Sequence, residues 1–273
     1  MPEGPEIKQA ADRIAIAIIQ QPLTGIFFAF DHLKPYEERL VGQSVTSVKP
    51  RGKALLTRFQ NQINIYSHNQ LYGKWVIRSA HSYPTTNRQL RLALHTQKKS
   101  ALLYSASDIE VLTDEQVATH PFLRRLGLDV LDEATTIDQV QERLLDKRFA
   151  RRGFAGLLLD QQFLCGLGNY LRSEVLFVAG VHPSLRPVDC TVEQIVKLAI
   201  AAIAVSRQAY QTHGITNDLE IVSTLKQQGY SRRAYRHFVF SREGQSCFVC
   251  GTEVLKVILA GRRLYYCPTC QSK

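Results

Sequence analysis

The sequence lacks an apolar segment long enough to cross a lipid bilayer. Its longest apolar run covers residues 198–205, whereas a membrane-spanning helix needs about 20 apolar residues. The N-terminus also lacks the basic stretch followed by an apolar one that marks a signal peptide. We therefore expect a soluble, cytoplasmic protein that does not bind a membrane.

The sequence has fewer acidic than basic residues. The chain carries 24 Asp and Glu against 34 Lys and Arg, so its formal net charge is +10 at pH 7. Such a charge attracts DNA, RNA or an anionic membrane surface, and a membrane is the weaker candidate here. Two basic clusters are either a groove for a nucleic-acid backbone or solvated faces. They are Lys147, Arg148, Arg151 and Arg152, and Arg232, Arg233 and Arg236.

Cysteine is scarce too, and four of the six cysteines form two CxxC pairs near the C-terminus. The pairs are Cys247 with Cys250, and Cys267 with Cys270. Two such pairs supply the thiolates of a tetrahedral zinc site. We predict one structural Zn2+ in a ribbon that presents Arg262 and Arg263 to a polyanion. Alternatively, the metal only fastens the chain end. Cys165 and Cys190 are expected to be thiols in a reducing compartment.

The pattern of the sequence changes near residue 126. Before it, an N-terminal helix precedes short alternating segments, which predict an antiparallel β-sandwich with that helix packed against it. The expected strands cover 26–30, 45–48, 54–59, 63–66, 90–94 and 101–104. After it, helical periodicity dominates. The fold class is therefore α+β and multidomain, with domains expected at 1–125, 126–235 and 238–272.

The helical half contains capping boxes at Thr136 and Thr191 and a segment, 157–177, that predicts helix, tight turn and helix. Asn169 can cap the second helix. Arg172 stands where a capping box would have an acid, which leaves the helix N-terminus available for a phosphate. A plain N-cap role for Asn169 is the alternative.

The N-terminus offers an amine nucleophile. A Met followed by Pro is normally trimmed, which leaves Pro2 with a secondary amine, and an α-amino group is unprotonated near pH 7 far more often than a lysine. Glu3 adjoins it and Glu6 lies one helical turn on. A carboxyl beside such an amine can move protons while a Schiff base forms. Alternatively, these acids only complement the helix dipole.

Six motifs occur together in one order along the chain. They are PEGPEI, RGKALL, YSHNQLYG, THPFLRRLG, DQQFLCGLGNYLRSE and the CxxC pairs. In this the chain resembles the formamidopyrimidine-DNA glycosylase/endonuclease VIII family over its whole length. The resemblance implies a helix-two-turn-helix domain and a zinc finger after the β-sandwich. It implies Pro2 as the Schiff-base nucleophile and Glu3 as the acid/base. Glu6, one helical turn on, is also a catalytic candidate. Lys53 would be the acid or phosphate-holding group beside the reacting sugar, and Arg125 and Asn169 would hold DNA phosphates. Arg262 would contact a phosphate and take part in the second elimination.

The implied reaction begins with rotation of a damaged nucleotide out of the duplex. Gln70, Leu71 and Tyr72 would fill the gap, as a hydrogen-bonding amide, an apolar wedge and a stacking ring. Base removal and strand cleavage by β,δ-elimination would follow, with zinc in a structural role. Without the resemblance, the three residues fit an ordinary turn.

The resemblance favours the branch that acts on oxidised pyrimidines. The purine branch inserts a methionine, whereas the initiator is the only Met in this chain, and the QLY triplet resembles the endonuclease VIII pattern. The expected partner is damaged double-stranded DNA, bound by a monomer without a nucleotide cofactor on the bacterial nucleoid. Two alternatives stay open: an 8-oxoguanine glycosylase of the same family, and a non-enzymatic zinc-ribbon DNA-binding protein.

Overall fold

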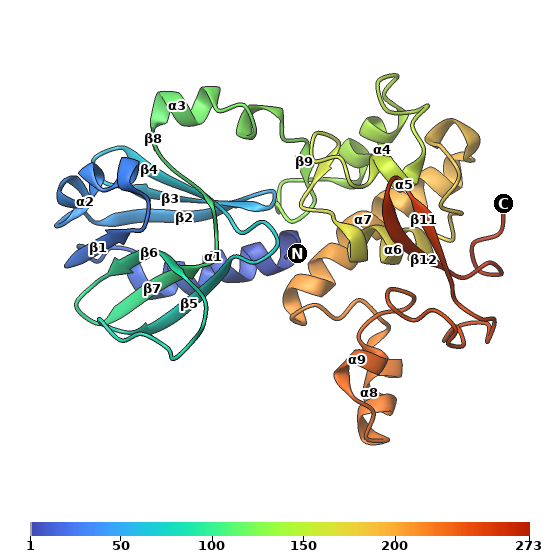
Figure 1. The fold of residues 1–273 in the computed structure, drawn as a ribbon. Helices are drawn as coiled ribbons and strands as arrows, with labels where there is room; N and C mark the ends of the chain where they lie inside the picture. Colours follow the sequence, from blue (N-terminus) through green and yellow to red (C-terminus); the bar gives the residue numbers. More distant parts are fainter. Residues whose placement is uncertain (1) are drawn as a thin grey trace. The chain divides into compact units, whose positions relative to one another are not determined.

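A computed structural model describes residues 2–273 (Figure 1). The chain divides into two units, the first ending at Arg125 and the second beginning at Leu126. No helix among the described residues combines the length and the apolar character needed to cross a bilayer.

The first unit is a β-sandwich flanked by α1 (Gly4–Ile18). One four-stranded sheet has the order β1-β6-β7-β5 and the other the order β2-β3-β4-β8, and all their pairings are antiparallel. The first sheet consists of β1 (Gly25–Phe28), β6 (Leu90–His95), β7 (Lys99–Tyr104) and β5 (Lys74–Ser79). The second consists of β2 (Val45–Arg51), β3 (Ala54–Phe59), β4 (Ile63–His68) and β8 (Asp108–Thr113). The predicted fold of this half is confirmed.

One hydrophobic core joins both sheets and α1. The buried face of α1 includes Ile7, Ala10, Ala11, Ile14 and Ile18. All of these but Ile7 belong to one core with residues such as Leu55 and Leu94 from the two sheets. Burial of this stripe supplies most of the stability of the helix, because each buried isoleucine contributes roughly 2 kcal/mol. Shorter elements complete the unit: η1 (Asp31–Leu33), α2 (Pro35–Leu40), α3 (Asp114–Thr119) and η2 (Leu123–Arg125).

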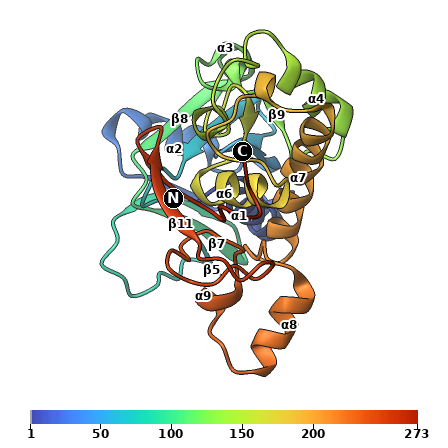
Figure 2. The same ribbon diagram turned by 90° about the vertical axis from the view of Figure 1, so that its right-hand side faces the viewer.

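The second unit is mostly helical, as predicted. Its elements are β9 (Leu128–Asp129), α4 (Ile137–Leu145), α5 (Phe154–Leu157), β10 (Leu164–Cys165), α6 (Asn169–Val178), η3 (Pro187–Asp189), α7 (Val192–Gln211), α8 (Leu219–Gln227) and α9 (Arg232–Tyr235). Thr136 and Thr191 form the predicted capping boxes with Gln139 and Gln194. Both views place α8 and α9 together, at the end of this unit opposite α4 (Figure 2).

Two local expectations for this unit were wrong. The first helix of segment 157–177 ends at Leu157, because Asp160 and Gln161 bond to nearby backbone groups and turn the chain toward β10. The cap of α6 is Gly168 rather than Asn169, which is the first helical residue.

The unit ends in a hairpin of β11 (Leu255–Leu259) and β12 (Arg262–Tyr266). Leu264 of β12 belongs to the core formed by α4, α6 and α7. The buried carboxylate of Glu174 in α6 accepts hydrogen bonds from the backbone N–H groups of Phe238, Val239 and Phe240. Burial raises its pKa, although these bonds and one from Thr216 oppose the rise. The segment entering the hairpin is thereby fixed to α6.

Candidate catalytic and DNA-binding site

The proposed nucleophile, Pro2, lies two residues before α1, which begins at Gly4. Glu3 is the N-cap of this helix and is 4% exposed. Its backbone N–H donates to Oε2 of Glu6 at 2.9 Å, which is one half of a capping box. Glu6 therefore orients the N-terminal turn, and Pro2 is partly exposed beside it. Met1, whose removal the sequence predicts, lies outside the described residues.

Lys53 lies in the tight turn between β2 and β3. Arg51 pairs with Ala54 across this turn, and Gly52 adopts a positive φ of 60°. Ala54 in turn pairs with His68 at the end of β4. Burial lowers the pKa of His68, the Asp108 carboxylate opposes this, and the charge of Lys53 adds to the lowering. The sheet thus places Lys53 close to His68.

The predicted wedge residues form the loop between β4 and β5. Leu71 is 54% exposed and Tyr72 is 67% exposed. The frame of the loop is held by side chains on either side of it. The backbone N–H of Gln70 donates to Nδ1 of His68 at 3.0 Å, and Arg88 donates to the carbonyl of Tyr72 at 2.5 Å. Two apolar side chains are therefore presented to solvent on a fixed backbone, which no core requirement explains.

A cavity of ≈ 530 Å³ opens beside this loop. Gln70 and Arg125 both line it, so two predicted DNA-binding residues meet here. Burial raises the pKa of Tyr66 and that of Asp108. Nε2 of His120 lies 3.3 Å from Oε1 of Glu110. The cavity is lined by Tyr66, His68, Gln70, Asp108, Glu110, His120, Pro121, Phe122 and Arg125.

Sequence reasoning missed His68, Asp108 and His120 as members of this site. His68 stood inside the quoted YSHNQLYG motif, so a signal for it existed. Asp108 and His120 come from β8 and from the loop after α3, and only the pairing of β8 with β4 brings them near the wedge loop. No local pattern marks such a contact.

In the second unit, Asn169 and the hairpin arginines lie on connected elements. Asn169 begins α6, which packs against β12, and Arg262 is the first residue of β12. Both Arg262 and Arg263 are exposed. Part of the first basic cluster is neutralised, since Arg148 pairs with Asp146 and Arg152 with Asp160. The hairpin tip therefore exposes two arginines to a polyanion.

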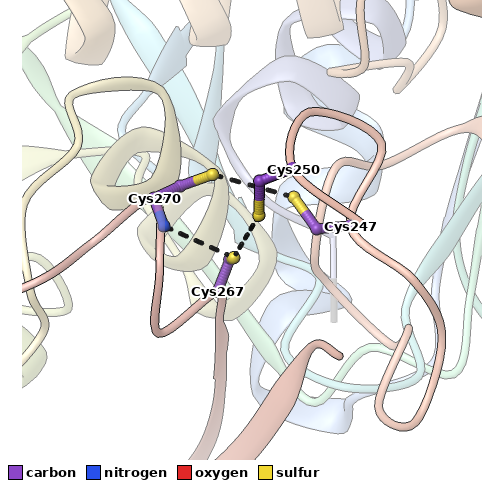
Figure 3. Close-up of side chains that lie close together, drawn as sticks. All are labelled: Cys247, Cys250, Cys267 and Cys270. Atoms are coloured by element: carbon purple, nitrogen blue, oxygen red, sulfur yellow. Dashed lines mark hydrogen bonds between the residues drawn. The ribbon is translucent and has the colours of Figure 1, made fainter. Parts of the chain in front are cut away.

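The four cysteines converge at the base of this hairpin (Figure 3). All four Sγ atoms lie within 4.8 Å of one another. The Cys247 and Cys270 sulfurs are 3.9 Å apart, and those of Cys250 and Cys267 are 3.4 Å apart. Tetrahedral zinc with Zn–S bonds of about 2.3 Å requires sulfurs about 3.8 Å apart. The cluster fits one structural Zn2+ without rearrangement, as predicted.

Three family models match successive parts of the chain. The N-terminal domain of formamidopyrimidine-DNA glycosylase matches residues 1–107, and its H2TH domain matches residues 126–220. A zinc finger found in FPG and IleRS matches residues 244–273.

Full-length relatives agree with these matches. The chain is 49% identical over 271 residues to endonuclease 8 of Escherichia coli strain K12 / DH10B, with 99% of this chain and 100% of that protein covered. It is 48% identical over 271 residues to endonuclease 8 of Klebsiella pneumoniae strain 342, with the same coverage.

Solved structures share the fold. Lactococcus lactis Fpg in complex with DNA containing an abasic site superposes with a TM-score of 0.81 at 21% identity, covering 99% of this chain and 100% of that one. Its complex with DNA containing N7-benzyl-Fapy-dG gives the same TM-score and identity over 100% of both chains. In fold, in zinc finger and along its whole length, this chain belongs to the formamidopyrimidine-DNA glycosylase family.

Proposed function

We propose that this enzyme excises oxidised pyrimidines from double-stranded DNA and then cleaves the strand by β,δ-elimination. Family membership makes it a DNA glycosylase with AP lyase activity, an enzyme of base excision repair. The observation that carries the finer assignment is the 49% identity to endonuclease 8 over the full chain. The exposed pair Leu71 and Tyr72 on a fixed loop supports it.

The Pro2 amine would start the chemistry. Its nitrogen forms a bond to C1′ of the extruded deoxyribose while the bond from C1′ to the damaged base breaks, and the base departs with that electron pair and a proton. Opening of the sugar ring leaves an iminium ion, a Schiff base that acidifies the C2′ hydrogen. Glu3, next to Pro2 in the chain, would carry protons during these steps.

Elimination would then cut the strand on both sides of the sugar. Loss of the C2′ proton expels the 3′ phosphate, and a second proton loss expels the 5′ phosphate. Lys53 would serve as an acid or hold a phosphate beside the sugar, and Arg262 would assist the second elimination. Arg125 and Asn169 would hold phosphates through charge-assisted hydrogen bonds. Zinc would shape the hairpin that carries Arg262.

The wedge loop would fill the space left by the extruded nucleotide. Saturated or ring-oxidised pyrimidines such as thymine glycol are non-planar and stack poorly, so they are cheaper to extrude than flat 8-oxoguanine. Leu71 and Tyr72 match the sizes of an apolar wedge and a stacking ring. The described chain offers no methionine for this task.

Borohydride trapping tests the nucleophile. Damaged duplex DNA is incubated with the protein and borohydride, and the expected product is a covalent adduct on the peptide that begins with Pro2. An adduct on any lysine instead would overturn the assignment of Pro2.

Single-turnover rates test the substrate. We expect thymine glycol and dihydrouracil duplexes to be cleaved much faster than 8-oxoguanine opposite cytosine. Leu71→Ala should slow cleavage of the duplex more than that of single-stranded DNA. A faster rate on 8-oxoguanine would favour the purine-specific alternative.

The two relatives compared above are both named endonuclease 8, so they give no support to the non-enzymatic alternative. These relatives are bacterial. We place the enzyme in the bacterial cytoplasm, on the nucleoid, as a monomer that uses no nucleotide cofactor. We also keep the three-domain division at 1–125, 126–235 and 238–272.

A further inference from the structure

Arg172 is an arginine with no exposed surface. It lies in the second turn of α6 and has 0% relative exposure. Removing a guanidinium from water costs several kcal/mol unless its N–H groups find acceptors. The cost is offset here by acceptors from three separate segments, so the position of each segment depends on this one side chain.

The acceptors belong to α5, to α6 itself and to the β11–β12 hairpin. Nη1 donates to the carbonyl of Ala155 at 2.5 Å and to that of Leu259 at 3.4 Å. Nη2 donates to Oδ1 of Asn169 at 2.7 Å and to the carbonyl of Arg263 at 2.9 Å. The guanidinium therefore links the start of α6 to both sides of the hairpin turn.

The bond to Asn169 fixes which way its amide faces. A guanidinium has donors only, so the atom of Asn169 that meets it must be the oxygen. The Nδ2 group, which carries two N–H donors, is then directed away from Arg172. At the positive end of the α6 dipole, this amide presents donors of the kind that a phosphate accepts.

The bonds to Leu259 and Arg263 hold the tip of the hairpin. These residues flank Ala260, Gly261 and Arg262. Ala260 and Gly261 both have positive φ, 51° and 70°, as a two-residue turn of type I′ requires. A second link from α6 to β12 is close by, since the N–H of Tyr265 donates to Oγ of Ser173 at 3.3 Å.

We propose that Arg172 is a positioning residue that makes one phosphate-binding unit out of Asn169 and the hairpin tip. It orients the amide of the first and anchors the backbone that carries Arg262 and Arg263. This inference rests on the proposed roles of Asn169 and Arg262 in binding DNA phosphates.

A set of variants tests it with duplex DNA that contains an uncleavable abasic-site analogue. Arg172→Met keeps the apolar stem but removes the donors, Arg172→Lys keeps the charge, and Val178→Ala is the control on the same helix, where Val178 is exposed. Zinc content and thermal unfolding are measured for each, and binding is measured across a range of salt concentrations.

Arg172→Met should weaken binding about tenfold or more and lower the salt-dependence slope by about 1 or more, whereas Val178→Ala should change neither. Arg172→Lys should recover part of the loss. Adding Asn169→Ala to Arg172→Met should cause little further loss, because the amide is already misplaced. Additive losses, or an unchanged slope in a folded, zinc-loaded Arg172→Met protein, would overturn the proposal.

Two further measurements keep the test independent of folding and of the proposed function. Hydrogen exchange of the free protein should show faster exchange for residues 259–263 in Arg172→Met, and unchanged exchange there would contradict the anchoring role. Asn169→Asp leaves the acceptor for Arg172 in place but turns an anionic oxygen toward the phosphate, so it should bind DNA more weakly than Asn169→Ala. Equal binding by these two variants would refute the amide orientation. If Asn169→Ala itself binds normally, the proposed role of Asn169 fails instead.

Discussion

The hydroxyl of Ser107 donates a hydrogen bond of 2.6 Å to Oε1 of Gln70. Ser107 directly precedes β8, while Gln70 follows β4, and the two strands pair along their whole length. Gln70 has a positive φ of 49°, a conformation that costs about 1 kcal/mol for a residue other than glycine. The side-chain bond offsets part of that cost and fixes the amide at the edge of the wedge loop.

Ser107→Ala should therefore slow cleavage of a thymine glycol duplex by roughly 3- to 10-fold, because a hydrogen bond of this kind contributes about 1 kcal/mol. Single-stranded DNA needs no wedge, so its rate should stay the same. Single-turnover kinetics on both strands measure the difference. Ser82→Ala, at an exposed serine in the same unit, is the control; an equal loss on both strand states would remove the loop from the explanation.

An N-terminal extension should abolish base removal and strand cleavage but leave DNA binding intact. Any residue before Pro2 converts its amine to an amide, which is not a nucleophile. Mass spectrometry identifies the blocked protein, and a gel-based nicking assay measures its activity. Nicking at the normal rate by a fully blocked protein would show that another amine forms the Schiff base.

Glu3→Gln should separate the two activities. The glutamine cannot carry protons, so release of an intact damaged base should fall by about 100-fold or more. On a preformed abasic site the base has already left, and part of the lyase activity should survive. Rates on the two substrates are compared side by side. Equal losses on both substrates would argue against the proposed role of Glu3 in base release.

Cys250→Ser should lose zinc and weaken DNA binding for every lesion alike, because the metal holds the hairpin rather than recognising a base. Metal content is measured by elemental analysis and binding by titration with several lesions. The control is Cys190→Ser, since Cys190 lies outside the four-cysteine cluster. Retention of zinc, or a loss confined to one lesion, would contradict the structural role of the site.

His237 should make the protein less stable in acid. Burial lowers its pKa to about 3, with smaller contributions from Arg236 and Arg232, and its ring contacts the hydroxyl of Thr216. Between the ordinary value of 6.5 and this lowered value, the unfolded chain binds the proton more readily than the folded one. Stability is therefore complete above pH 6.5 and declines below it, by about 2 kcal/mol at pH 5.

His237→Gln should flatten this decline, whatever it does to stability at neutral pH. Thermal unfolding between pH 5 and pH 7.5 measures the slope, and the exposed His32 changed to Gln serves as the control. A slope unchanged in His237→Gln would assign the acid sensitivity to other groups.

The sequence predicted elements well where one periodicity dominates. β3 begins and ends as expected, and the N-terminal helix packs against the sandwich as predicted. β5 and β8 were missed because neither strand alternates cleanly: Trp75, Val76 and Ile77 are consecutive apolar residues in β5, as are Val111 and Leu112 in β8. α2 was missed because a short helix carries too few turns to show a period.

For the candidate site, motifs identified residues but not their relations. The resemblance named Asn169 and Arg262 separately. Arg172, whose guanidinium links them, was noted in the sequence only because a capping box would have an acid at its position. Its carbonyl partners, Ala155, Leu259 and Arg263, come from segments far apart in the chain. Backbone acceptors leave no trace in residue identity, so only tertiary structure reveals them.

The absent side chain of Gly73 divides the wedge loop into a part that cannot vary and a part that can. A Cβ at this position would lie 2.5 Å from the carbonyl oxygen of Asn69, so every other residue is excluded unless the backbone moves. Leu71 and Tyr72 meet no such restriction, because their side chains extend into solvent. Under the proposed wedge role, side chains of other sizes at these two positions are therefore expected to change lesion choice while the fold of the domain stays the same.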